Sequence, residues 1–166
     1  MIYGLIGEKL GHSFSKEIHE RLSDYTYNLF PLSKDEFHTF MKNKDFQAIN
    51  VTIPYKKAVL PYLDELDASA KKIGAVNTIV NNNGKLKGFN TDYDGFDYML
   101  QKHHVDLSNK KVLVLGNGGA CAAIKAVVES YPIKQIHVVS RKAGDDVITY
   151  EECYETVERC DVIRIL

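Results

Sequence analysis

A glycine-rich turn between an apolar strand and a helix is the feature that most limits the folds open to this chain. The apolar segment 111–115 is followed at once by the turn, and small residues then open a segment of helical character. Glycine permits positive φ in such a turn, and the unpaired N–H groups at the helix start can approach a pyrophosphate. This order of elements is that of a nucleotide-binding βαβ unit. The predicted cofactor-binding residues of the turn are Gly116, Asn117, Gly118, Gly119 and Ala120.

The second strand of this predicted unit ends in two cations. The apolar segment 136–139 begins 20 residues after the first glycine of the turn, and it is followed by Ser140, Arg141 and Lys142. NAD-binding units usually place Asp or Glu at this point, where the acid binds a ribose hydroxyl. A guanidinium and an ammonium in its place favour the 2′-phosphate of NADP. The alternatives are a purely structural glycine turn and an ordinary pair of solvated charges.

Short apolar runs alternate with longer stretches of helical period along the whole chain. The run 81–84, three asparagines followed by glycine, predicts a hairpin. This alternation indicates an α/β fold with a mainly parallel sheet. Helices are expected to begin at the capping residues Ser15, Ser33 and Asp67. The predicted strands are residues 2–6, 27–30, 48–51, 78–81, 85–89, 111–115 and 136–139.

A polar stretch at 103–110 separates a predicted helix from the apolar strand that precedes the glycine turn. Because domain boundaries fall in polar linkers, we place one in this stretch. Residues 1–104 are then expected to form an α/β domain with a mainly parallel sheet. Residues 105–166 are expected to form an incomplete Rossmann-like domain that binds the nucleotide.

Charge and composition exclude several kinds of partner. The 166 residues carry a formal net charge of −1, so no long-range positive field is expected to collect nucleic acid or an anionic membrane surface. No segment approaches transmembrane length, and the N-terminus resembles a strand rather than a signal peptide. The three cysteines lack CxxC spacing, which predicts no metal site and a reducing, cytoplasmic environment. An anionic small molecule would have to be bound by locally placed groups.

The N-terminal part carries polar side chains that folding alone does not require. They lie in four loops beside predicted strand ends, where ligands of open α/β sheets collect. Together the loops supply hydroxyls, two amides, one ammonium and one carboxylate. This set suits a small ligand with several hydroxyl groups and a carboxylate. The loops are residues 11–15, 50–56, 74–78 and 88–92.

Each of these side chains also has a structural explanation. Ser13 or Ser15 can cap a helix, and Asp92 can cap the helix that follows it. The asparagines can satisfy turns. Lys56, which stands beside a second lysine, would by default be a solvated charge. The coincidence of four such loops with a nucleotide loop further along the chain favours a ligand site.

In their order along the chain, these motifs resemble those of the shikimate dehydrogenase family. The resemblance runs from Gly7 to about Ile163 and covers both predicted domains. It implies that residues 1–104 form the substrate-binding catalytic domain and that NADP is the cofactor, in agreement with Arg141. The matching segments are residues 12–15, 50–56, 74–78 and 90–92.

The resemblance also implies a role for individual side chains. Ser13 and Ser15 would bind a substrate carboxylate. Thr52, Asn77 and Asp92 would bind ring hydroxyls. The catalytic residues would be Lys56 and Asp92, with the lysine placed beside the carboxylate.

The implied activity is the NADPH-dependent, reversible reduction of 3-dehydroshikimate to shikimate in chorismate and aromatic amino-acid biosynthesis. Such a reduction needs a hydride and a proton, and a lysine near a carboxylate can donate the proton. Two alternatives stay open. One is a quinate or shikimate dehydrogenase that uses NAD, against which Arg141 argues. The other is a non-catalytic module that binds shikimate.

The C-terminal end departs from the family, which continues past the position of Ile163, whereas here Arg164, Ile165 and Leu166 end the chain. About one and a half βα units cannot bury both faces of a parallel sheet, so apolar surface should stay exposed. Either the chain is a fragment or truncated product, or another chain supplies the missing surface. We expect a homodimer, or aggregation, through the incomplete second domain.

Overall fold

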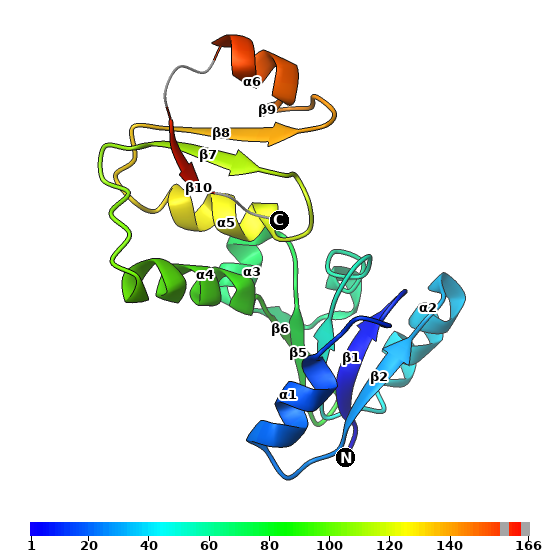
Figure 1. Ribbon diagram of the computed structural model, residues 1–166. Helices are drawn as coiled ribbons and strands as arrows, with labels where there is room; N and C mark the ends of the chain where they lie inside the picture. The colour runs from blue at the N-terminus through cyan, green and yellow to red at the C-terminus, as the bar shows by residue number, and fades with distance from the viewer. Residues whose placement is uncertain (157–159, 164–166) are drawn as a thin grey trace. The chain divides into compact units, whose positions relative to one another are not determined.

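The computed structural model describes residues 1–156 and 160–163 (Figure 1). The predicted departure at 164–166 lies outside these residues. The chain divides into two compact units, Met1–Thr91 (unit 1) and Asp92–Leu166 (unit 2). The sequence predicts a domain boundary at residue 104, after a helix. The observed division comes before that helix, which therefore belongs to unit 2.

Unit 1 is built around a six-stranded sheet, called sheet A here, with strand order β2-β1-β3-β5-β6-β4. The pairs β1–β2, β1–β3 and β4–β6 are parallel, and the pairs β3–β5 and β5–β6 are antiparallel. The predicted α/β fold with a mainly parallel sheet is therefore confirmed. The strands are β1 (Tyr3–Gly7), β2 (Tyr27–Pro31), β3 (Ala48–Val51), β4 (Glu65–Leu66), β5 (Thr78–Asn82) and β6 (Lys85–Phe89).

Two of the three predicted helix starts in unit 1 are confirmed by their capping bonds. Ser33 caps its helix in a capping box, in which its side chain accepts from the backbone of Glu36. Asp67 accepts the N–H of Ala70 at 2.7 Å. The expectation that Ser15 is a cap is wrong, because it is the first helical residue. The helices are α1 (Ser15–Leu22), α2 (Lys34–Asn43), α3 (Ala68–Ile73) and the 3₁₀ helix η1 (Leu60–Tyr62).

The main core of unit 1 joins sheet A to α2. Phe37 and Met41 are buried on one face of α2, and the Phe37 ring stacks on Tyr55 with the ring centroids 4.2 Å apart. The predicted hairpin is confirmed as the β5–β6 connection, where Asn83 and Gly84 both take positive φ (52° and 88°). Positive φ at both central residues is the requirement of a tight hairpin turn.

Unit 2 holds a four-stranded sheet, called sheet B here, with order β10-β7-β8-β9 and only parallel pairs. In chain order this is the 3-2-1-4 arrangement of a Rossmann half, as the glycine turn predicts. The strands are β7 (Lys111–Leu115), β8 (Gln135–Ser140), β9 (Val147–Thr149) and β10 (Asp161–Ile163). The helices are α4 (Thr91–Lys102), α5 (Cys121–Val128) and α6 (Tyr150–Thr156).

The core of unit 2 explains why α4 groups with it. Leu100 of α4 is 2% exposed and belongs to the same buried cluster as Val112 of β7 and Val127 of α5. Figure 1 shows α5 beside β7 and β8, the strands that it connects. None of the helices among residues 1–156 is both long and apolar enough to span a bilayer.

Candidate functional site

Three strand ends of sheet A bring predicted ligand-binding residues of unit 1 to one edge. Thr52 follows β3, and its N–H donates to the carbonyl oxygen of Ile6 at 2.9 Å. Asn77 lies at the same edge because it precedes β5, which runs antiparallel to β3. The Asn77 carbonyl oxygen accepts the N–H of Val51 at 2.8 Å, and the Asn77 N–H donates to the carbonyl oxygen of Phe89 at 3.0 Å.

Lys56 is held at this edge through its backbone. The preceding turn is closed by the N–H of Tyr55, which donates to the carbonyl oxygen of Thr52 at 2.9 Å. The carbonyl oxygen of Lys56 accepts the N–H of Val76 at 2.8 Å. Lys56 is partly buried, whereas the adjacent Lys57 is exposed. The two lysines therefore differ in their exposure to solvent.

The predicted carboxylate-binding serines lie where the chain enters α1. Ser13 precedes the helix, and its Oγ accepts the backbone N–H of Ser15 at 3.2 Å. Residue Phe14 occupies the N-cap position and makes no side-chain capping bond. Both serines are partly buried. Their hydroxyls follow β1, at the same end of the parallel strands as Thr52.

Two asparagines are buried in unit 1, and their amides are used differently. Asn90 is 2% exposed and donates from Nδ2 to the carbonyl oxygen of Ala75 at 2.9 Å. It therefore supports the local backbone, as the structural alternative expects. Asn77 is 9% exposed, and its Oδ1 accepts the N–H of Thr91 while its Nδ2 donates to the Thr91 hydroxyl, each at 3.0 Å. The Asn77 amide is thus held by a neighbouring residue in a fixed orientation.

Asp92 is the second residue of α4 and belongs to unit 2. It is partly buried and lies in the first turn of the helix, where a negative charge is favourable beside the positive end of the helix dipole. Unit 1 therefore collects every predicted substrate-binding residue except this one.

The glycine loop of unit 2 has the geometry that a dinucleotide requires. Gly116 takes a φ of 109°, which favours glycine, and its N–H donates to the carbonyl oxygen of Val139 at 2.7 Å. Gly118 begins the turn into α5, since its carbonyl oxygen accepts the N–H of Cys121 at 3.1 Å. The chain is exposed from Asn117 to Gly119. The loop therefore leaves backbone groups open to solvent directly before a helix N-terminus.

The end of β8 lies beside this loop. Residue Val139 of β8 pairs with Leu115, the last residue of β7, so the segments after both strands leave sheet B at the same edge. Ser140 is partly buried there, and Arg141 and Lys142 are exposed. A hydroxyl and two cations at this edge fit a phosphate on a ribose whose pyrophosphate lies at the glycine loop. The donor set therefore fits the predicted NADP site.

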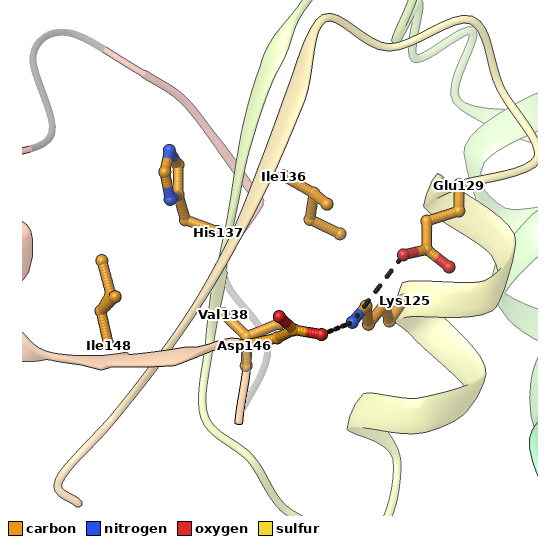
Figure 2. Close-up of a pocket in the computed structure, with 7 residues that line it drawn as sticks. All are labelled: Lys125, Glu129, Ile136, His137, Val138, Asp146 and Ile148. Atoms are coloured by element: carbon orange, nitrogen blue, oxygen red, sulfur yellow. Dashed lines mark ion pairs between the residues drawn. The ribbon is translucent and has the colours of Figure 1, made fainter. Parts of the chain in front are cut away.

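Unit 2 also contains a separate cavity of about 370 Å³ (Figure 2). Lys125 lies in it between two carboxylates, with Nζ 3.6 Å from Asp146 and 3.9 Å from Glu129. The cations that follow β8 do not line it. The remaining lining residues are Ile136, His137, Val138 and Ile148. The cavity is thus distinct from the predicted cofactor residues.

Sequence reasoning missed Tyr27, which contacts the site from the second strand of sheet A. Its hydroxyl donates to Oδ1 of Asn50 at 2.6 Å, and Nδ2 of Asn50 donates to the hydroxyl of Thr78 at 3.0 Å. A buried tyrosine needs a partner for its hydroxyl, and a tyrosine in an apolar strand is the signal that could have indicated one. Within residues 1–156 and 160–163, no group of three or more His, Cys, Asp or Glu side chains is placed to hold a metal ion.

Comparison with known proteins identifies the family. The shikimate dehydrogenase substrate binding domain family matches residues 5–79. The chain is 43% identical over 148 residues to a shikimate dehydrogenase (NADP(+)) of Clostridium beijerinckii. The alignment covers 84% of this chain and 55% of that protein. The chain thus spans little more than half the length of this curated relative.

Two solved structures extend the likeness to the fold. Shikimate dehydrogenase 1 from Peptoclostridium difficile superposes with a TM-score of 0.89 at 35% identity, over 99% of this chain and 67% of that one. The Thermus thermophilus shikimate 5-dehydrogenase in complex with NADP(H) and shikimate gives a TM-score of 0.75 at 31% identity, over 86% of this chain and 57% of that one. With a likeness that covers both units, this chain belongs to the shikimate dehydrogenase family.

Proposed function

We propose that this protein acts as a shikimate dehydrogenase, which reduces 3-dehydroshikimate to shikimate reversibly with NADPH. The observation that carries the proposal is the shared edge of sheet A. Backbone bonds hold Thr52, Lys56 and Asn77 there. The related Thermus thermophilus enzyme, solved in complex with NADP(H) and shikimate, supports the same pair of ligands for this chain.

In the proposed binding mode, one set of side chains binds the substrate carboxylate and another set binds the ring hydroxyls. The hydroxyls of Ser13 and Ser15 bind the carboxylate, because hydroxyls can donate to its oxygens. Thr52, Asn77 and Asp92 bind the ring hydroxyls, which need both donors and acceptors. A carbonyl group of the substrate would then lie among residues that can supply a proton.

Lys56 and Asp92 are the proposed catalytic residues. NADPH, when bound, supplies the hydride that reduces the carbonyl carbon. The ammonium of Lys56 donates a proton to the carbonyl oxygen as that oxygen becomes a hydroxyl, and in the reverse direction the neutral amine accepts it. Asp92 is proposed to bind a ring hydroxyl and to work with the lysine in catalysis. Aromatic amino-acid (chorismate) biosynthesis is the proposed setting of the reaction.

The proposed cofactor is NADP, bound by unit 2. The loop from Gly116 to Ala120, which is exposed from Asn117 to Gly119, would hold the pyrophosphate with backbone N–H groups. Ser140, Arg141 and Lys142 would bind the 2′-phosphate. We propose residues 1–104 as the substrate domain and residues 105–166 as the part of the nucleotide domain in this chain. Helix α4, at the end of the first range, packs in the core of unit 2.

Two measurements on the whole chain test this proposal. We expect absorbance at 340 nm to rise when shikimate and NADP are supplied, and calorimetry to detect shikimate binding. Binding and turnover together support the dehydrogenase. Absence of both from a chain with intact circular dichroism contradicts it.

A second candidate is a module that binds shikimate without reducing or oxidising it. One observation favours it: unit 1 has its own core and holds every proposed substrate-binding residue except Asp92. This candidate predicts a calorimetric signal with shikimate and no change in NADP absorbance. A quinate or shikimate dehydrogenase that uses NAD would instead give the larger rate with NAD.

We also propose a homodimer, formed through unit 2, and a cytoplasmic location. Strands β9 and β10 form the two edges of sheet B, and edge strands offer backbone groups to a second chain. Sedimentation analysis that finds only monomer across a wide concentration range contradicts the dimer. Recovery of the protein outside the cytoplasmic fraction of its cell contradicts the location.

A further inference from the structure

A chain of hydrogen bonds crosses sheet A from its edge strand β2 to Asn77. The hydroxyl of Tyr27 donates to Oδ1 of Asn50 at 2.6 Å, and Nδ2 of Asn50 donates to the hydroxyl of Thr78 at 3.0 Å. The Thr78 hydroxyl then donates to Oδ1 of Asn77 at 3.1 Å. All three donations run in the same direction, and bonds in such a chain polarise one another. The chain therefore connects a residue of β2 to a proposed substrate-binding amide.

The orientation of the Asn77 amide follows from its bond with Thr91. A backbone N–H can only donate, so the Asn77 atom that faces the N–H of Thr91 must be the oxygen. That oxygen lies within hydrogen-bonding distance of the backbone N–H of Thr91 at 3.0 Å, the Thr91 hydroxyl at 3.2 Å and the Thr78 hydroxyl at 3.1 Å. Thr91 thus identifies which end of the amide is oxygen, and the Thr78 hydroxyl, the last donor of the hydrogen-bonding chain, helps to hold that oxygen in place.

Tyr27 is a rigid start for this chain. The residue is 2% exposed, and its ring stacks on the ring of His19 with centroids 4.0 Å apart. Its backbone N–H donates to the carboxylate of Glu20 at 3.1 Å. Burial, with a smaller contribution from Tyr25, raises the pKa of Tyr27, so its hydroxyl keeps its proton throughout the neutral range.

We propose that Tyr27 and Thr78 are positioning residues that help to hold the Asn77 amide in its ligand-binding orientation. Thr78 bonds the amide directly, and Tyr27 acts through Asn50 and Thr78. The inference rests on the proposed function for its ligand. Neither residue needs to touch the substrate. Loss of the Tyr27 hydroxyl leaves Oδ1 of Asn50 without the donor shown here, and the Asn50 amide can then rotate. Loss of the Thr78 hydroxyl removes the only side chain in this chain of bonds that both accepts from Asn50 and donates to Asn77.

The decisive variants are Tyr27→Phe and Thr78→Val in the whole chain, titrated with shikimate by calorimetry. We expect each to weaken binding about fivefold to tenfold, which is the scale of one net hydrogen bond. Thr78→Ser keeps the hydroxyl and should restore binding to within about twofold. Tyr55→Phe is the matched control, because the Tyr55 hydroxyl is also buried but donates to the carbonyl oxygen of Leu32 at 2.7 Å. We expect it to lower stability and leave the affinity unchanged.

A double-mutant cycle separates positioning from general loosening. Asn77→Ala should weaken binding by itself, and Tyr27→Phe should then add less than about twofold, because it acts through the missing amide. Equal losses with and without Asn77 would overturn the proposal.

A readout without ligand keeps this test apart from the proposed function. The side-chain amide of Asn77, assigned by its disappearance in Asn77→Ala, should shift in nitrogen–proton correlation spectra of Tyr27→Phe and stay in place in Tyr55→Phe. An unshifted signal in Tyr27→Phe refutes the positioning role. A shift in a chain whose wild type binds no shikimate supports the hydrogen-bonded connection and contradicts the proposed substrate.

Discussion

The backbone N–H of Val76 donates a 2.8 Å hydrogen bond to the carbonyl oxygen of Lys56. This bond joins two motifs that are distant in sequence, because Val76 is followed directly by Asn77. Neither residue could move along the sheet edge without breaking a bond in the other segment. Lys56 is thereby held beside the proposed substrate-binding amide, and the neighbouring Lys57 is exposed.

We expect Lys56→Ala to reduce turnover about 100-fold or more, since general acid–base residues contribute on that scale. The shikimate dissociation constant should change by less than about fivefold, because Ser13, Ser15 and Asn77 still bind the acid and the ring. Steady-state kinetics and calorimetry measure the two quantities. Lys57→Ala, which removes an adjacent exposed ammonium, is the control and should leave both unchanged. Undiminished turnover in Lys56→Ala would remove the residue from the catalytic role.

Arg141 is expected to distinguish the two nicotinamide cofactors. Arg141→Ala should weaken NADP binding about tenfold, because a charge-assisted bond to the 2′-phosphate is lost. NAD lacks this phosphate, so its dissociation constant should stay within about twofold. Lys134→Ala is the control, since it removes an exposed cation that precedes β8 instead of following it. Equal losses of affinity for NADP and NAD would show that Arg141 does not bind the 2′-phosphate.

Gly4 should not tolerate a side chain. A Cβ placed there would lie 2.3 Å from the backbone carbonyl oxygen of Asn28, in the neighbouring strand β2. We expect Gly4→Ala to destabilise the fold by about 2–3 kcal/mol, the upper range for overpacking. Urea unfolding measures the change.

At Gly95, the same glycine-to-alanine substitution is expected to stabilise the fold instead of destabilising it. It lies inside α4, and a Cβ there would meet no atom within 4 Å. We expect Gly95→Ala to stabilise the helix by about 0.5–1 kcal/mol, because alanine loses less backbone entropy on folding than glycine. A destabilisation similar to that of Gly4→Ala would show that the close contact at Gly4 is not the cause.

Local chemistry made much of the fold predictable from the sequence. The capping residues Ser33 and Asp67 satisfy backbone donors within their own first turns, so no distant contact is needed to place them. The β5–β6 hairpin follows from residues that accept positive φ. The start of α1 was harder, because Ser13 and Ser15 both suit a cap and the position is taken by Phe14.

Other features depend on partners that are remote in the sequence. Strand β9 pairs with the last three residues of β8, from Val138 to Ser140. Between the end of β8 and the start of β9, the chain has to return along the strand direction by only about 7 Å, the rise of two residues. A short loop covers this distance, so no crossover helix is needed. The hydrogen bond from Tyr27 to Asn50 likewise joins two strands, β2 and β3, and nothing in the local sequence around Tyr27 indicates it. Among the site residues, the motifs therefore predicted the loops, and the supporting contacts required the sheet register.

The capping box of α2 predicts a pH-dependent loss of stability. Hydrogen bonds from the side chain and backbone of Ser33 lower the pKa of Glu36 from its usual value of 4.5. Because the folded-state pKa is the lower one, the ionised carboxylate stabilises the fold above pH 4.5, and this contribution is lost as pH falls through the folded-state pKa. Ser33→Ala should therefore lower the melting temperature more at pH 7 than at pH 4, as followed by circular dichroism. Glu36→Gln keeps an acceptor for the capping box but does not ionise, so it should remove the pH dependence. A Ser33→Ala effect of equal size at both pH values would contradict this linkage.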